Sequence, residues 1–467
     1  MRALSFVAVV ALGIAAGGCG ATSLEVLSPG TDAGGASGEG GGLATPDAGP
    51  PAPDAGTRAQ YCSGTGSPIV VSAGDAGAGA ACLGGLAQSA FRWALCTCNG
   101  LVSATALTTD SFDGTQGAYD AGAAHAGGGL GTNGNLSAQG TLTIGGALWV
   151  SDATGMTVAT ASAQGELHAA GRVASGPSLT VGGDAYVLGN VAATGDLHIA
   201  GTLHQPAGAS ASAGGAKTIG ATATGSFTVP PACDCDPALL IDVASYVEAY
   251  RATNDDAAVG VDPNALANVN SNTTLALPCG RIFFTRVGGT GAITLTLSAG
   301  RTAIFVGGDL APNGSFTIDA PAGSEVDVFV EGGVVAGSTF ALGSAASPAK
   351  ARLWVGGTAT VNLPNAALLA GNVYAPRSEL VLGSNPTTVF GSIFVQRVSA
   401  QGSLTIHYDE SVLGAGASCG PSTGTCSSCH DCANQACLGG TCGACSDSSE
   451  CCAPLVCNAG KCVDVIH

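Results

Sequence analysis

A short unit recurs through the middle of this chain: a run of alternating apolar residues, a glycine pair, and a second alternating run. Alternation with a period of two predicts β-strands, and the glycines mark corners that need a positive φ or close backbone approach. Successive glycine turns lie about 15 to 25 residues apart where the pattern is densest, which is the length of one coil of a β-solenoid. The unit occurs in LTIGGALWV (142–150), LTVGGDAYVLGNV (179–191), LHIAGTL (197–203), AIFVGGDL (303–310), DVFVEGGVV (327–335), RLWVGGTATV (352–361), LLAGNVYAP (368–376) and VFGSIFV (389–395).

The sequence therefore predicts an all-β fold, a single-stranded β-helix that we expect to be right-handed. The 74 glycines and a charged fraction of only 10% are typical of such repetitive β-structure. A β-sandwich is the alternative, but its strands usually carry more aromatic residues and hairpin turns such as Asn-Gly. The calcium-binding nonapeptide repeat is absent from the sequence, so we do not expect calcium to hold the coils together.

We expect five parts along the chain. The segment from Cys82 to Cys96 has apolar residues at the spacing of an amphipathic helix, which would be stapled by cysteines and would cover an open end of the stack. Those apolar residues are Leu83, Leu86, Ala87, Ala90, Phe91 and Leu95. The parts are a signal peptide (1–18), a lipid anchor with a disordered Gly/Pro/Ala tether (19–60), the helical cap (61–106), the β-helix (107–413) with a helical insertion near 233–275, and a cysteine-rich module (414–467).

The helical insertion is predicted from its start signals. Asp236 is placed as an N-cap and Pro237 as the first helical residue. We expect the helix to cover a flank of the solenoid with the apolar residues Leu240, Val243, Val247 and Tyr250.

The N-terminus has the pattern of a lipoprotein signal peptide. Arg2 precedes an apolar run from Leu4 to Ala16, and two glycines precede Cys19. Signal peptidase II requires small residues before a cysteine, so we expect the mature protein to begin at a diacylated Cys19. An ordinary secretory signal is the alternative. This pattern predicts an exported outer-membrane lipoprotein that is held to the membrane through its first residue. We expect it to lie at the cell surface or to face the periplasm.

The charge excludes one class of partner. The formal net charge is −18, and only 14 residues are Lys or Arg. Neutralising phosphates requires clustered basic residues, which this sequence lacks, so we expect no binding to nucleic acid.

Nineteen cysteines in an exported chain predict disulfides, because the space outside the cytoplasmic membrane is oxidising. Without Cys19, the body and the tail each hold an odd number, so full pairing needs a bridge between them, for which Cys419 is the candidate. Free thiols or an intermolecular bridge are the alternatives. We also expect Cys279 to pair with Cys233 or Cys235. The candidates are Cys62, Cys82, Cys96, Cys98, Cys233, Cys235, Cys279, Cys419, Cys426, Cys429, Cys432, Cys437, Cys442, Cys445, Cys451, Cys452, Cys457 and Cys462.

Part of the tail has the spacing of zinc ligands: Cys426, Cys429, His430 and Cys432, followed by the pair Cys442 and Cys445. In an oxidising compartment we favour disulfides instead, and the adjacent cysteines 451 and 452 suit a disulfide-rich module. We therefore expect no metal and no cofactor.

Carboxylates and histidines are the candidate catalytic groups. Asp184 and Asp309 occupy the same place in two Gly-Gly-Asp turns, where stacked coils could align acids as glycosidases and lyases require. Asp after a glycine corner is also an ordinary turn residue, which is the interpretation that we favour. The cluster His407, Tyr408, Asp409 and Glu410 lacks a nucleophile motif, so we expect a closing strand with satisfied polar groups.

The remaining histidines are scattered. His168 and His198 share a Gly-x-Leu-His pattern in neighbouring coils, whereas His125 and His204 belong to no shared motif. Two histidines alone are a weak indication of a metal site.

Two stretches resemble known families. GNVYAP (371–376), FGSIFV (390–395) and HYDESVL (407–413) together resemble a bacterial domain of unknown function found in exported lipoproteins and in pilus-assembly proteins of the PilX type. The resemblance covers residues 230–413, and 82–225 more loosely. It implies a β-helix in the cell envelope, without an established activity. CSDSSECCAPLVCNAGKC (445–462) resembles Dickkopf-like or colipase-like modules, which implies an interaction scaffold.

These features predict a cell-envelope lipoprotein with a structural, adhesive, or glycan- or protein-binding role and no catalysis. The solenoid offers a long flat side that suits a polysaccharide or an envelope protein. Two alternatives stay open. One is a polysaccharide lyase or hydrolase on the same fold, and the other is a pilus or envelope assembly component, which uncapped solenoid ends would favour.

Overall fold

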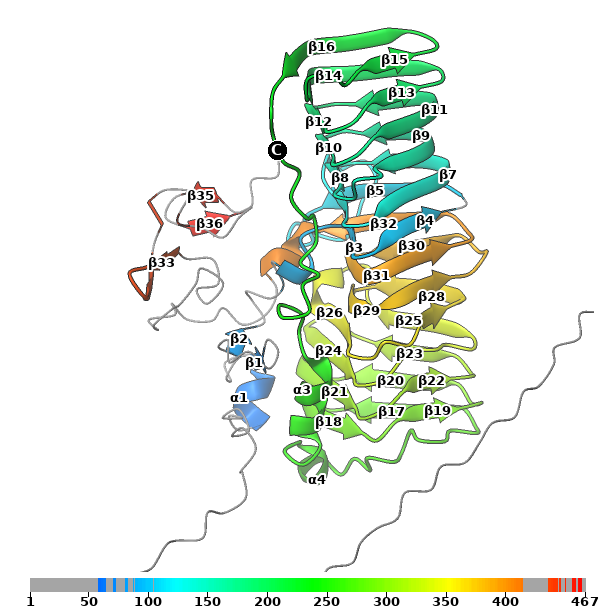
Figure 1. The fold of residues 1–467 in the computed structure, drawn as a ribbon. Helices are drawn as coiled ribbons and strands as arrows, with labels where there is room; N and C mark the ends of the chain where they lie inside the picture. The colour runs from blue at the N-terminus through cyan, green and yellow to red at the C-terminus, as the bar shows by residue number, and fades with distance from the viewer. Residues whose placement is uncertain are drawn as a thin grey trace, which may run out of the picture. The chain divides into compact units, whose positions relative to one another are not determined.

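The computed structural model describes residues 58–63, 70–72, 80–82, 87, 89–103, 105–414, 436–443, 445–446, 450, 456–458 and 461–463. Parallel strands wind into a β-solenoid of about 14 turns (Figure 1). The predicted all-β solenoid is confirmed, and the sandwich is excluded.

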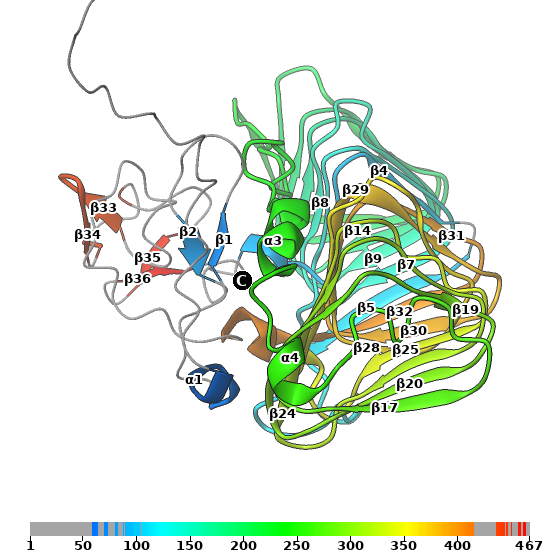
Figure 2. The same ribbon diagram turned by 90° about the horizontal axis from the view of Figure 1, so that it is seen from below.

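Each full coil supplies three strand segments, which stack into three sides of the solenoid (Figure 2). The strands of the first half are β3 Leu95–Thr97, β4 Gly100–Ser103, β5 Leu107–Phe112, β6 Leu130–Thr132, β7 Asn135–Ile144, β8 Leu148–Val150, β9 Met156–Ala163, β10 Leu167–Ala169, β11 Val173–Val181, β12 Ala185–Val187, β13 Val191–Ala193, β14 Asp196–Gln205, β15 Ala211–Ala213 and β16 Lys217–Thr224. Those of the second half are β17 Thr273–Leu277, β18 Gly280–Phe284, β19 Val287–Gly289, β20 Ile293–Leu297, β21 Gly300–Val306, β22 Leu310–Pro312, β23 Phe316–Asp319, β24 Ser324–Val330, β25 Thr339–Gly343, β26 Ala351–Val355, β27 Val361–Leu363, β28 Asn365–Ala370, β29 Asn372–Leu382, β30 Thr387–Phe390, β31 Ile393–Ala400 and β32 Leu404–Asp409.

The remaining elements are short. They are the helices α1 Arg58–Cys62, α3 Val243–Tyr250 and α4 Asp256–Val259, the 3-10 helices η1 Pro348–Lys350 and η2 Glu410–Gly414, and the strands β1 Val70–Ser72, β2 Ala80–Cys82, β33 Ala436–Leu438, β34 Thr441–Gly443, β35 Val456–Asn458 and β36 Lys461–Val463. Antiparallel pairs join β1 to β2, β33 to β34 and β35 to β36. Among the described residues, no helix is long and apolar enough to cross a bilayer.

The chain enters the solenoid in the middle of the stack. β3 pairs with β6 on one edge and with β31 on the other, and β5 lies in the same way between β7 and β32. From there the chain coils to β16 at one end and then crosses to the other end through residues 226–272. It coils again from β17 until β32 meets the first half in the middle of the stack (Figure 1). We call residues 226–272 the return segment. The pairs of β3, β4 and β5 with β31 and β32 form a seam between the halves. Both halves advance in the same direction, so the seam is parallel like every other step of the stack.

The predicted helical cap at residues 61–106 is therefore wrong. Residues 89 and 90 are helical, but Leu95 begins β3, which is paired on both edges. Ala87, Ala90 and Phe91 are buried. Their apolar spacing reflects packing between two coils in the middle of the stack and not an amphipathic helix over its end.

Aliphatic side chains of alternate strand residues fill the interior. The pattern Leu136, Ala138, Leu142, Ile144 in β7 is repeated by apolar partners in β9, and all of these side chains are buried. Glycine is required at some corners: Gly155 has a φ of 77°, and a Cβ there would collide with the carbonyl of Arg172 in the next coil.

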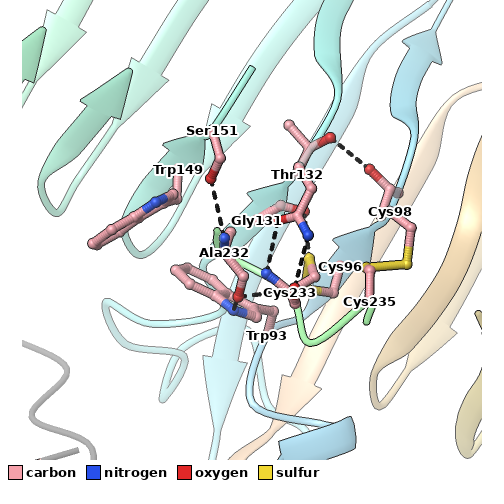
Figure 3. The surroundings of a disulfide bond; sticks show 12 residues. Trp93, Cys96, Cys98, Gly131, Thr132, Trp149, Ser151, Ala232, Cys233 and Cys235 are labelled. Carbon is pink, nitrogen blue, oxygen red and sulfur yellow. Dashed lines mark hydrogen bonds between the residues drawn. A yellow bond between two sulfur atoms is a disulfide. The ribbon is translucent and has the colours of Figure 1, made fainter. Parts of the chain in front are cut away.

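Disulfides attach the return segment to β3. Cys96 bonds to Cys233 and Cys98 to Cys235, on adjacent outward positions of the strand (Figure 3). Cys279 pairs with Cys62, which holds α1 against the solenoid, so the expected pairing of Cys279 with Cys233 or Cys235 is wrong. Sequence proximity suggested that pairing, but the return segment carries the chain away from Cys233 before Cys279 is reached.

The insertion is shorter than predicted. α3 begins at Val243 behind the N-cap Asp242, whose side chain accepts from the Ser245 N–H, whereas Asp236 caps only a turn. Its predicted place on a flank is confirmed. Tyr246 packs edge-on against Phe305 and Phe329, at ring-centroid distances of 5.5 and 4.8 Å. The four predicted contact residues, Leu240, Val243, Val247 and Tyr250, are buried.

In the tail, Cys437, Cys442 and Cys445 are disulfide-bonded, as predicted for an oxidised module. Cys82 lies in β2, Cys457 in β35 and Cys462 in β36. The predicted signal peptide, lipid anchor Cys19 and tether as far as residue 57 fall outside the described residues, as do Cys419, Cys426, Cys429, His430, Cys432, Cys451 and Cys452. The last three residues of the predicted disordered tether, 58–60, are helical in α1, so that part of the prediction is wrong.

Candidate functional site

One side of the solenoid carries hydroxyl side chains in register. Thr143 of β7 is aligned with Ser162 of β9 on one side and with Thr108 of β5 on the other. Because the residues before and after each hydroxyl are buried in the interior, strand alternation directs the hydroxyls outward. We call this side the threonine face. Its main row is Thr388, Thr405, Thr108, Thr143, Ser162, Thr180, His198 and Thr218, and the row Thr274, Thr294, Thr317 occupies the same side near the other end.

The main row crosses the seam without a break. Thr405 of the second half is aligned with Thr108 of the first. A second row, Thr141, Thr160, Ser178 and Asp196, runs beside it on the same strands. Neighbouring strands lie about 4.8 Å apart, so hydroxyls recur at that interval along the axis.

The row hydroxyls are free to bind. Those of Thr108, Thr143, Ser162, Thr180 and Thr405 form no hydrogen bond with another described residue, and the side chains are partly exposed. Each hydroxyl can donate one hydrogen bond and accept two. The face can therefore bind a neutral polar surface that repeats along one direction.

A second side carries aromatic rings. In the second half the rings are buried, α3 packs on Phe305 and Phe329 through Tyr246, and Arg251 lies 5.2 Å above the ring of Phe283. We call the aligned positions the aromatic row: Phe283, Phe305, Phe329, Trp354, Tyr374, Phe394, Cys96, Gly131, Trp149, His168, Tyr186 and His204.

In the first half the aromatic row is partly exposed but is not a platform for sugars. The rings of Trp149, His168, Tyr186 and His204 stack face to face with centroids 3.7, 4.7 and 4.3 Å apart. Stacking occupies the ring faces that a sugar would need. The return segment packs along the ring edges instead, and the indole N–H of Trp149 donates to the carbonyl of Pro230 at 2.8 Å. In the first half, the aromatic row is therefore the surface on which the return segment packs.

The cluster around His407 lies at the seam. His407 Nδ1 is 2.7 Å from Asp110 Oδ1, and Tyr119 donates to the other oxygen of Asp110 while its ring stacks on the imidazole. Burial, followed by the hydrogen bond to Asp110, raises the pKa of Tyr119 to about 12. The Tyr408 hydroxyl donates to the Phe91 carbonyl. The polar groups of the cluster are satisfied, as predicted, but β32 does not close the stack, because it pairs with β30 on one edge and with β5 on the other.

A serine and a histidine also meet at the seam, but not as a catalytic pair. Ser111 Oγ lies 2.9 Å from His125 Nδ1, and Glu410 Oε1 lies 3.6 Å from the same nitrogen. A relay needs the serine and the acid on opposite nitrogens of the ring. Ser111 is fully buried, so it offers no exposed nucleophile.

The two corner aspartates are turn residues, as predicted, but they bond the next coil. Asp184 Oδ1 accepts from the N–H of Thr202, and Asp309 Oδ1 accepts from that of Gly333 at 2.8 Å. They lie in different halves and do not form a pair of acids.

The two histidines of the shared motif lie on different sides. His168 is stacked in the aromatic row and bonds Glu166 at 2.7 Å, and burial lowers its pKa against the effect of that carboxylate. His198 belongs to the threonine face. Among the described residues, no three potential ligands are grouped to hold a metal ion.

Asp256 is the carboxyl group whose pKa is most clearly raised. Burial lifts it to about 6, because one oxygen accepts only from the Phe283 N–H and the other has no partner. The group lies at the β18 edge, away from the threonine face, and its role is structural.

Replacing Asp256 by asparagine should stabilise the protein above pH 6. The folded pKa is raised, so the ionised carboxylate costs stability in full above pH 6, where both states are charged. The cost falls as the folded group binds a proton and disappears below the ordinary pKa of 3.8. We expect Asp256→Asn to gain about 1–2 kcal/mol of unfolding free energy at pH 8 and about a third of that at pH 4.5. Denaturant unfolding at the two pH values measures this; an equal gain at both would show that charge is not the cause.

Comparison with known proteins identifies part of the chain. Residues 234–414 match a family described as a domain of unknown function, DUF7305, in agreement with the predicted resemblance over 230–413. No curated protein matches the chain. A solved structure, the ice binding protein from an Antarctic bacterium of the Flavobacteriaceae, aligns with 68% of this chain and 80% of its own at 12% identity and a TM-score of 0.14. The family match begins in the return segment and ends at η2, so it covers the second half of the solenoid.

The threonine face and the aromatic row are absent from the sequence prediction, although the sequence signals both. A threonine between two apolar residues recurs in LTI, LTV and FTI, and an aromatic residue takes that place in LWV, AYV, VFV and IFV. The repeated central residue indicates an outward row that alternation alone does not reveal.

Proposed function

We propose that this protein is a non-catalytic scaffold of the cell envelope that binds an extended, neutral polysaccharide along the threonine face. The observation that carries the proposal is the row of unpaired hydroxyls that continues in register through the seam. A polymer with repeated hydroxyls can exchange hydrogen bonds with such a row at successive coils.

The charge of the molecule supports a neutral ligand. The net charge of −18 opposes binding of an anionic polymer, and the main row between Thr388 and Thr218 contains no ionised carboxylate or ammonium group. Hydroxyl groups alone bind weakly, so affinity would come from many contacts along one chain.

The use of the acidic residues supports a role without catalysis. Asp184 and Asp309 accept backbone hydrogen bonds at corners, and Asp110 is shared by His407 and Tyr119. Export and lipidation at Cys19 complete the proposal: the anchor and tether would present the solenoid to polymers near the membrane.

The test incubates the oxidised full-length chain with insoluble cellulose and chitin, which are neutral, and with peptidoglycan, whose carboxylates make it an anionic comparison. Retained protein and newly formed reducing or unsaturated ends are measured in the same samples. We expect retention on at least one of the two neutral polymers without release of new ends. Sustained release of new reducing or unsaturated ends would show that the protein is an enzyme. If no polymer retained the protein, the proposal that its ligand is a polysaccharide would be wrong.

A further inference from the structure

The two ends of a solenoid are the surfaces at which unwanted association with another molecule is most easily started. An end coil exposes an unpaired strand edge and the apolar interior, and both promote association with another copy. The ends of this molecule are formed by β16 and by β17 to β19 (Figure 1).

At the β16 end, the interior turns polar in the last coil. An interior row of Leu142, Ala161, Leu179 and Leu197 is buried, and the next residue in register is Lys217. One further interior position becomes polar in the same coil, where Leu203 is followed by Thr222, while Ile199 is followed by Ile219 and stays apolar.

The Lys217 side chain lies across the end of the coil. Its Nζ donates to the carbonyl of Ala211 on β15 at 2.6 Å. The ammonium group is exposed, and it lies where the leucine of another coil would otherwise pack. Among the described residues, only β14 pairs with β16, so its outer edge is unoccupied.

The opposite end is closed by carboxylates. The outward N–H groups of β18 alternate along the strand: that of Arg281 donates to Asp255 Oδ2 at 2.9 Å and that of Phe283 to Asp256 Oδ1 at 3.1 Å. The next in the series, Thr285, donates to the Pro263 carbonyl at 2.9 Å. The two aspartates thus take the place of the carbonyls that an added strand would supply.

The return segment continues this closure along β19. The N–H of Gly288 donates to the Leu266 carbonyl, and the N–H of Val269 donates back to the Gly288 carbonyl. Leu266 and Val269 are buried, so this part of the return segment also covers the interior.

From these contacts we infer that the β16 end can pair with a second copy of this chain and that Lys217 prevents this pairing, whereas Asp255, Asp256 and the return segment occupy the edges of β18 and β19 at the other end. Removing the ammonium group allows two copies to pair through β16. Because the same edge of each copy is used in this contact, association stops at a two-fold dimer and does not continue into a fibre.

The experiment compares Lys217→Leu with Lys350→Leu in the full oxidised chain, with Cys19→Ser in every sample so that acylation cannot cause association. Lys350 lies in η1 in the middle of the stack and is exposed, so its variant makes the same change of charge and size away from the ends. Sedimentation measures mass over a hundredfold range of concentration. We expect Lys217→Leu to approach twice the monomer mass, while Lys350→Leu and the parent remain monomeric.

Each other result would overturn a named part of the inference. A monomeric Lys217→Leu at the highest concentration would remove the role of Lys217, and a dimeric parent would show that the end is already in use. Assemblies larger than a dimer would show that Asp255 and Asp256 do not close their end. If Lys217→Leu fails to fold, Lys217→Gln removes the ammonium group with a smaller change of side chain and gives the same test.

Discussion

Replacing Asp409 by alanine is expected to lower the free energy of unfolding by about 3–5 kcal/mol. Asp409 is fully buried at the seam. Its Oδ1 accepts from the N–H groups of Gly114 and Ser411 at 2.8 and 3.0 Å and from the Ser411 hydroxyl, and its Oδ2 accepts from the Ala349 N–H at 3.2 Å. The carboxylate therefore joins a loop of the first half to η1 and η2 of the second half, and its loss leaves buried donors unpaired.

Asp319→Ala is the matched control. Asp319 ends β23 and is exposed, so the variant changes the charge equally without removing a buried acceptor. Denaturant unfolding of both variants should show a lower midpoint for Asp409→Ala alone. Equal midpoints would mean that the carboxylate does not hold the seam. Gly114 gives a second check, because a Cβ there would lie 2.5 Å from Asp409 Oδ2, so Gly114→Ala should also destabilise the protein.

Removing both disulfides between β3 and the return segment should cost about 3–5 kcal/mol, and removing either one should cost much less than half of that. Each bridge spans 137 residues and closes a loop around the whole first half. When one is lost, the other still restrains nearly the same loop in the unfolded chain. The second loss releases that restraint completely.

A double-mutant cycle measures this dependence. The variants are Cys96→Ser with Cys233→Ser, Cys98→Ser with Cys235→Ser, and the combination of all four, each compared with the parent by denaturant unfolding. The bridge between Cys62 and Cys279 spans 217 residues and encloses the same loop within a wider one, so it is kept intact in every variant. Additive losses for the two β3 bridges would contradict the shared-loop explanation.

The coils could be predicted from the sequence because each coil carries its own local signal. Glycine corners and alternating strands identified the solenoid, and the corner aspartates and the α3 contact residues also lie where they were expected. These signals act within one coil or between neighbours in sequence.

The order of coils could not be predicted in the same way. The seam depends on contacts such as His407 with Asp110 and the Ser392 hydroxyl with the Trp93 carbonyl, between residues almost 300 positions apart. No local pattern indicates that β3 has neighbours on both edges. That missing contact is why the apolar residues before Leu95 predicted an end cap, and why Cys279 was assigned the wrong partner.

The structure also bears on the alternative of envelope assembly. We expected uncapped ends to favour it, and the predicted helical cap argued against it. Within residues 61–106, β3 and β4 lie in the middle of the stack and do not cover an end, but Lys217 at one end and Asp255 and Asp256 at the other now provide that argument. This agrees with the proposed binding through a long side of the solenoid.

The measurement that tests the central claim most directly is the binding of two lysine variants to the polysaccharide that retains the parent. Thr143→Lys with Thr180→Lys places long charged side chains on the threonine face, and Ser137→Lys with Ala174→Lys adds the same charge on another side of the same strands, β7 and β11. We predict that the first variant loses at least tenfold in affinity, while the second binds like the parent. Equal binding by both variants would show that the threonine face is not the binding surface.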